Sequence, residues 1–164
     1  MYASTINEDI NFSSMNSEKQ LYLEDLSVGQ EFISREHHVD AEQIISFASQ
    51  YDPQSFHLDP EAAQNSFFKG HVASGWHTAA ITMKLLVESV PFAAGIIGLG
   101  GGISWPRPTR PGDDLHVRSR IIEIQPSKSK PDRAIVHLQA LTYNQTGDVL
   151  QELTAKLFVF RRES

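Results

Sequence analysis

The chain contains no cysteine among its 164 residues. This absence excludes disulfide bonds, thiolate zinc sites and cysteine nucleophiles. A concentrated basic cluster is also missing: 14 Lys and Arg residues are scattered among 20 Asp and Glu residues, and the net charge is −6. That balance argues against nucleic acid as a partner, because phosphate backbones are bound through concentrated positive charge.

Long hydrophobic runs are lacking as well. No apolar segment approaches the roughly 20 residues of a membrane-spanning helix. The first 20 residues, MYASTINEDINFSSMNSEKQ, carry neither the basic nor the apolar region of a signal peptide. We therefore predict a soluble, cytoplasmic protein with no membrane partner. Residues 1–20 are expected to form a polar tail and residues 21–164 a single domain, which is long enough to bury its own core.

Two capped helices are predicted early in the chain. Asp40 is a good N-cap, and Gln43 three residues later completes the pattern of a capping box before an amphipathic helix over 41–50. Pro53 cannot continue this helix, so Asp52 is expected at its end.

The second helix starts at Asp59-Pro60, an N-cap followed by proline in the first helical position, and extends to about Ser66. His57 is then expected in a tight connection between two rigid elements, where functional side chains are often held.

A longer helix is predicted from Ser74 to Val90, ending at Pro91. Helical spacing places a broad apolar face opposite a narrow polar stripe, which is typical of a mostly buried helix. The expected apolar face consists of Trp76, Ala79, Ala80, Met83, Leu86, Val87 and Val90, and the polar stripe of His77, Lys84 and Glu88.

The remainder of the chain has the pattern of β-strands. Alternation along LHVRSRIIEI slips at Ile121-Ile122, which indicates a β-bulge, and VLQELTAKLFVF alternates cleanly. Helices come first and consecutive strands follow, so the predicted class is α+β with an antiparallel sheet. Because one long buried helix accompanies one sheet, we expect the sheet to wrap around the helix.

The glycine-rich segment GIIGLGGGISW does not fit a nucleotide-binding loop. Such a loop needs G-x-G-x-x-G between a strand and a helix, whereas this segment leads into Pro106 and Pro108. We interpret the glycines as positions where a strand bends or approaches another backbone closely.

Seven histidines are present, but none has metal-ligand spacing, and no H-E-x-x-H motif occurs. We therefore predict no metal and no other cofactor. A serine hydrolase centred on Ser74 is disfavoured, because ASGWH is not the G-x-S-x-G turn of those enzymes.

Ser74 and Gly75 lie at the predicted start of the long helix. Backbone N–H groups there have no partner within the helix, so the Gly75 N–H could stabilise negative charge on a substrate carbonyl oxygen. An ordinary helix start explains the same two residues. Asp52 and His57 are equally ambiguous by spacing alone: they are either an acid–base pair or two polar residues of a turn.

Several motifs in order resemble the MaoC-like dehydratases, the family that contains the (R)-specific enoyl-CoA hydratases. YDPQSFHLDPEAA resembles their D-x-N-P-[LIV]-H segment, with Asp52 and His57 on the two acid–base positions. HVASGWHT resembles the start of their central helix, and SWPRPTRPGDDLHVR their P-V-x-x-G-D segment. The likeness extends from about Leu23 to Arg161. Gln54-Ser55 stands where the hydratases have Asn-Pro.

This resemblance implies a hot dog fold, in which the sheet wraps around the helix from Ser74 to Val90. It also implies pairing into a homodimer or a higher oligomer that binds acyl thioesters of coenzyme A or acyl carrier protein. Asp52 and His57 would then be catalytic, and Ser74 and Gly75 would bind substrate. The expected reaction is reversible hydration of a trans-2-enoyl thioester to a 3-hydroxyacyl thioester.

Two alternatives to hydration stay open at this point. The first is a thioesterase of the same fold, which usually carries a carboxylate on the central helix; here that helix offers only Glu88. The second is a subunit that binds acyl thioesters without turning them over. Arg107, Arg110 and Arg118 are candidate phosphate contacts.

Overall fold

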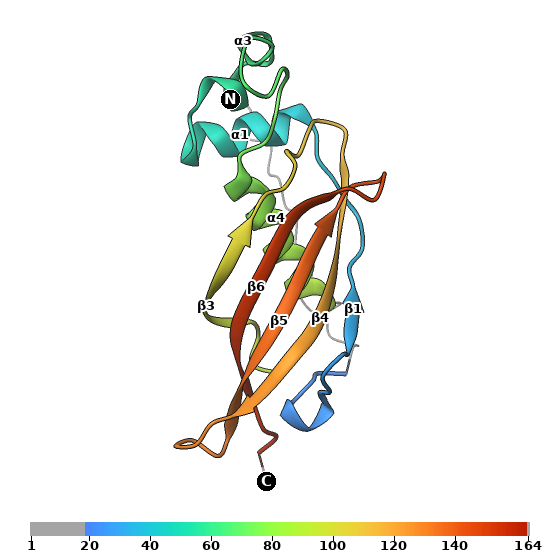
Figure 1. Cartoon of the computed structure of the whole chain (residues 1–164), viewed down its shortest axis with the longest axis vertical. Coiled ribbons are helices and arrows are strands. Elements are labelled where there is room, and N and C mark those ends of the chain that lie inside the picture. The colour runs from blue at the N-terminus through green and yellow to red at the C-terminus, as the bar shows by residue number, and fades with distance from the viewer. Residues whose placement is uncertain (1–18, 164) are drawn as a thin grey trace, which may run out of the picture.

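The computed structural model describes residues 19–163, which form a long antiparallel sheet with one helix along its face and further helices beyond one end (Figure 1). The elements in chain order are η2 (Leu23–Asp25), β1 (Glu31–Ile33), β2 (His37–His38), α1 (Ala41–Tyr51), α2 (Ser55–Leu58), α3 (Pro60–Ala63), α4 (Gly75–Ser89), β3 (Ile97–Ser104), β4 (Asp114–Pro126), β5 (Arg133–Tyr143) and β6 (Val149–Phe160).

The sheet has the strand order β1-β4-β5-β6-β3, with β2 pairing to β4 beyond β1, and all these pairs are antiparallel. The helix α4 runs along one face of the sheet, and α1 to α3 lie beyond the end at which β3 finishes (Figure 1). The buried core joins Ile81, Leu85 and Leu86 of α4 to inward-facing side chains of β4, β5 and β6. This is the predicted α+β class and the sheet-around-helix arrangement of a hot dog fold.

The side of α4 that faces the sheet differs from the prediction. Trp76, Met83 and Val87 are 60%, 42% and 52% exposed, whereas His77 is buried. Hydroxyl pairs explain the difference, because threonines can be buried when they bond to each other. The two pairs are Thr78 with Thr109 at 2.8 Å and Thr82 with Thr142 at 2.7 Å.

The early helices follow the predicted caps with three corrections. Asp40 accepts the Gln43 N–H at 2.8 Å, but the Gln43 amide turns to the His38 carbonyl, so the capping box is only half formed. The helix α3 ends at Ala63 instead of near Ser66, and the connection predicted around His57 contains the extra helix α2.

Gly101 in β3 confirms the interpretation of the glycine-rich segment. A Cβ at this position would lie 1.9 Å from the Thr154 carbonyl oxygen of β6, closer than any real contact. The strand also bends, because its register with β6 shifts between Gly98 and Gly100. The bulge predicted at Ile121-Ile122 is confirmed by a register shift between Ile121 and Glu123.

Two further observations concern residues 19–163 only. None of their helices is long and apolar enough to cross a membrane. No group of three or more metal-ligating side chains comes together among them. Apart from Lys19 and Gln20, the predicted polar tail over 1–20 lies outside the described residues.

Candidate active site

The structure brings Asp52 and His57 together. Asp52 terminates α1, and the chain turns through Pro53 into α2, which carries His57. The Nε2 atom of His57 lies 3.1 Å from Oδ2 of Asp52. The histidine is 4% exposed, and the Asp52 side chain is 18% exposed, so the pair is held inside the protein with access from one side.

Backbone carbonyl groups fix the orientation of the His57 ring. Its Nδ1 lies 2.8 Å from the Val72 carbonyl oxygen, and a carbonyl only accepts, so Nδ1 carries a proton and donates. Nε2 is therefore the nitrogen that can exchange a proton with Asp52 or with a ligand. A second buried histidine supports the turn, because Nε2 of His71 donates to the His57 carbonyl oxygen at 2.6 Å.

Three groups around Asp52 keep it ionised. Burial raises the pKa of this carboxyl, but hydrogen bonds from Ser74 and Gln54, together with His57, outweigh burial and hold the pKa below its ordinary value. The Gln54 amide donates to Oδ1 at 2.7 Å. The glutamine that stands in place of the hydratases' asparagine thus orients the carboxylate.

Ser74 and Gly75 lie beside this pair at the start of α4. The fully buried Ser74 hydroxyl accepts the Trp76 N–H at 3.2 Å and lies close enough to Asp52 to help lower the pKa of that carboxyl. Among residues 19–163, the Gly75 N–H has no acceptor. A Cβ on Gly75 would meet the Trp105 ring at 2.7 Å, so close packing against an indole is what demands glycine here.

Asp52, His57 and Gly75 line a pocket of about 570 Å³, together with aromatic and polar residues, whereas the fully buried Ser74 is not among its lining residues. Of the three candidate phosphate contacts, Arg107 and Arg110 line it, whereas Arg118 lies on β4 opposite Ile33. The lining consists of Asp52, Gln54, Phe56, His57, Phe67, Phe68, Ala73, Gly75, Trp76, Thr78, Trp105, Pro106, Arg107, Pro108, Thr109 and Arg110.

A larger hollow of about 1280 Å³ lies between the start of β3 and the end of β6. Its lining contains aromatic and charged residues but no histidine and no acid–base pair like Asp52 and His57. The smaller pocket is therefore the candidate site, because chemistry depends on placed groups more than on volume.

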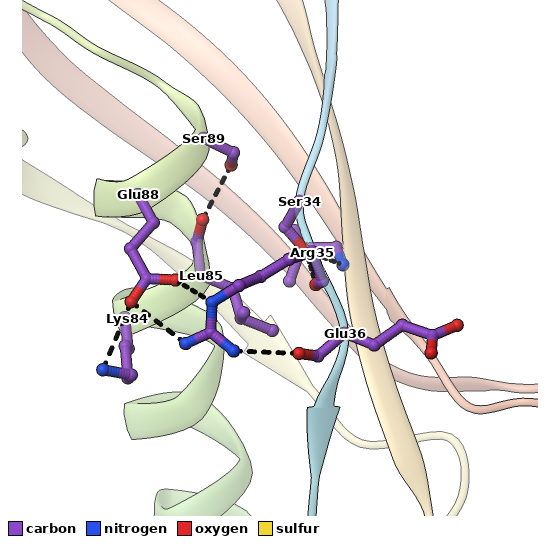
Figure 2. A network of polar contacts seen from close by, with 8 residues as sticks. Ser34, Arg35, Glu36, Lys84, Leu85, Glu88 and Ser89 are labelled. Atoms are coloured by element: carbon purple, nitrogen blue, oxygen red, sulfur yellow. Dashed lines mark hydrogen bonds and ion pairs between the residues drawn. The ribbon is translucent and has the colours of Figure 1, made fainter. Parts of the chain in front are cut away.

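Glu88, the carboxylate that a thioesterase would use, is occupied elsewhere (Figure 2). Arg35 donates to both of its oxygens, at 2.7 and 3.1 Å, and Lys84 lies 3.2 Å away. The hydrogen bond from Arg35 is the main cause that holds the pKa of Glu88 below its ordinary value, against the opposing effect of burial. Thirteen residues of helix put Glu88 about 20 Å from Gly75 along the axis, which is too far to act at the same site. Its ion pair with Arg35 instead fastens α4 to the segment between β1 and β2.

His77 is not among the residues that line this pocket, and we expect it to make the stability of the fold depend on pH. Its ring stacks on Phe47 at 4.6 Å, and its Nδ1 is buried without a hydrogen-bond partner among residues 19–163. Burial, with a smaller effect of His37, lowers its pKa to about 4. The unfolded chain takes up this proton near pH 6.5 and the folded chain does not. The contribution of His77 to stability is therefore complete above pH 6.5 and decreases towards pH 4.

Between pH 6.5 and pH 4, we expect the unfolding free energy of the wild type to fall by about 2 kcal/mol through His77. His77→Phe should lack this decrease, because phenylalanine does not take up a proton. Urea denaturation from pH 7 to pH 4 measures the effect. His116→Phe is the matched control, because that ring stacks on Tyr143 on the sheet surface. Parallel pH curves for wild type and His77→Phe would contradict the assignment.

Comparison with known proteins shows which family the chain resembles in sequence and structure. The family model described as "MaoC like domain" matches residues 25–144. A MaoC-like dehydratase from Rhodospirillum rubrum is 60% identical, with a TM-score of 0.87 over 88% of this chain and 99% of that one. The R-hydratase PhaJ1 from Pseudomonas aeruginosa is 25% identical, with a TM-score of 0.73 over 87% and 88%.

The uncharacterized protein YdeM of Bacillus subtilis is 31% identical over 125 residues, which are 75% of this chain and 87% of YdeM. The match to the family model covers more than half of the chain and includes Asp52, His57, Ser74 and Gly75. The chain belongs to the MaoC-like dehydratase family and has its hot dog fold.

Proposed function

We propose that this protein reversibly adds water to a trans-2-enoyl thioester of coenzyme A or acyl carrier protein and gives a 3-hydroxyacyl thioester. The observation that carries the proposal is the Asp52–His57 contact at 3.1 Å, in a pocket that Gly75 at the start of α4 also lines. Similarity to the R-hydratase PhaJ1 supports it.

The geometry supports separate roles for the two residues. Water is a weak nucleophile and must lose a proton as it attacks C3, and the ionised Asp52 carboxylate can accept that proton. C2 gains a proton at the same time, and His57 can supply it only through Nε2, because Nδ1 is bonded to Val72. Transfer of the new proton from Asp52 to His57 across 3.1 Å restores the starting state.

The start of α4 would stabilise the charge that develops. Attack at C3 moves electrons to the thioester oxygen, and the Gly75 N–H at a helix N-terminus can donate to it. Ser74, the residue before Gly75, helps to keep the pKa of Asp52 low, so the base stays ionised.

A panel of trans-2-enoyl-CoA thioesters tests the proposal through the loss of absorbance of the conjugated enoyl group. Release of free thiol from saturated acyl-CoA, without hydration, would instead indicate a thioesterase. Calorimetric binding of thioesters with no turnover across the panel would favour a non-catalytic binding subunit.

We also infer that the protein acts as a homodimer joined through β3. This strand is at the edge of the sheet, and Ile97 and Leu99 on it are 39% and 45% exposed. Exposed apolar side chains of α4, namely Trp76, Met83 and Val87, continue this surface. The Trp76 ring lies 5.3 Å from the ring of Trp105, which follows the end of β3. Unpaired edges and apolar patches of this kind are normally covered by a partner.

We expect Leu99→Lys to convert the dimer into a monomer in analytical ultracentrifugation, because it places a charge in the proposed interface. Ile122→Lys on β4 is a matched control, since Ile122 is also 45% exposed but lies away from β3. A Leu99→Lys protein that sediments like wild type would contradict the interface.

A further inference from the structure

Trp105 lines the pocket, and contacts on several sides fix the position of its ring. It follows the end of β3 and precedes Pro106, so its backbone has little freedom. Its indole N–H donates to Oε1 of Gln151 at 2.9 Å. Its ring meets Trp76 edge to face, with an interplanar angle of 79°.

The third restraint is Gly75. A Cβ on this residue would lie 2.7, 2.8 and 3.0 Å from Cε2, Cδ2 and Cζ2 of Trp105. Cδ2 and Cε2 form the bond shared by the two rings, and Cζ2 is bonded to Cε2. Because the three atoms are almost equally near, the indole presents a face to the Gly75 Cα. Trp105 is nevertheless 38% exposed, so part of the ring remains open to the pocket.

Gln151 holds the Trp105 ring through this hydrogen bond. It is fully buried in β6, its oxygen accepts from Trp105, and its Nε2 has no partner among the described residues. A buried amide with one half unpaired costs stability. Its presence is explained if the hydrogen bond to Trp105 is needed for function.

We propose that Trp105 is a positioning residue for the thioester, with Gln151 acting through it. The ring packs against the Cα of Gly75, next to the backbone N–H that would receive the thioester oxygen. A thioester held there lies against the indole, and this contact sets the placement of C2 and C3 before Asp52 and His57. The inference rests on the proposed hydration and adds the group that orients its substrate.

We expect Trp105→Ala to lower kcat by about 10- to 100-fold with a smaller change in KM, because misplacement by an ångström can cost about that much.

Two further variants test the hydrogen bond between Trp105 and Gln151. Trp105→Phe keeps an aromatic face but loses the N–H, and Gln151→Met loses the acceptor. Both remove the same hydrogen bond, so each should lower kcat several-fold and the double variant should be no worse than either. Gln151→Met should leave thermal stability near wild type, because it also removes the unpaired amide. A merely structural tryptophan would show the reverse: lost stability with kcat retained.

Fluorescence tests the contact without turnover. The chain has two tryptophans, so Trp76→Phe leaves Trp105 as the single emitter. Butyryl-CoA, which has no double bond to hydrate, should change its emission at concentrations that saturate binding in calorimetry. Saturated binding without any change, or Trp105→Ala with kcat within about twofold of wild type, overturns the proposal. If emission changes but no enoyl thioester is hydrated by wild type, the proposed function fails and the Trp105 contact stands.

Discussion

Asp52→Asn is expected to lower kcat for enoyl hydration by about 10²- to 10⁴-fold, the range that a positioned acid–base group supplies. The amide has nearly the same shape and can still contact Gln54 and His57, but it cannot accept a proton from water. Absorbance of a trans-2-enoyl-CoA measures the loss. Circular dichroism and thermal unfolding should show a folded protein.

His57→Gln is the companion change and should cause a loss in the same range. Its amide can donate towards the Val72 carbonyl or Asp52 but has no proton to give to C2. Since the two residues act in one step, the double variant should be little worse than either single variant. Near-normal turnover by either single variant, in a folded protein, would refute the assigned roles.

Gly101→Ala is expected to have the largest effect on stability. The added Cβ would lie 1.9 Å from the Thr154 carbonyl oxygen and 3.0 Å from the Ala155 Cα, and both are backbone atoms that cannot rotate away. Relief requires β3 to move off β6 and lose ladder hydrogen bonds. We expect the unfolding free energy to fall by about 3 kcal/mol or more, at or above the upper end for overpacked sites.

Gly102→Ala is the matched control for this prediction. It changes the next residue of the same strand in the same way, but a Cβ there meets nothing within 4 Å. Chemical denaturation should therefore separate the two variants clearly. Equal stabilities would mean that β3 does not pack against β6 as closely as the structure shows.

The helix boundaries on either side of Asp52 and His57 were predictable because local rules govern them, whereas the assignment of the two residues as a pair came from the resemblance to the MaoC-like dehydratases. Proline and an N-cap determine where α1 ends and α3 begins, and this brings an aspartate and a histidine to one turn. The start of α4 at Ser74-Gly75 follows from the same rules.

What could not be predicted depends on contacts between distant parts of the chain. The buried side of α4 was misassigned because threonines of α4 find partners far along the sequence, such as Thr142. Nothing near His71 or Gln151 in the sequence shows that one supports the His57 turn and the other holds Trp105. The sequence left Gly75 as either a substrate contact or an ordinary helix start, because the Trp105 ring that requires glycine there lies thirty residues away.

The order of strands has a consequence for how the chain folds. The strands β4, β5 and β6 are joined in sequence as hairpins and can pair as each emerges. The strand β3 precedes all three, and its partner within residues 19–163 is β6. A contact that spans so much sequence is slow to form because the intervening chain must first be ordered. We therefore expect the glycine-rich β3, with Ile97 and Leu99, to stay unpaired until β6 has been synthesised. During synthesis this interval is the time at which the protein is most exposed to aggregation.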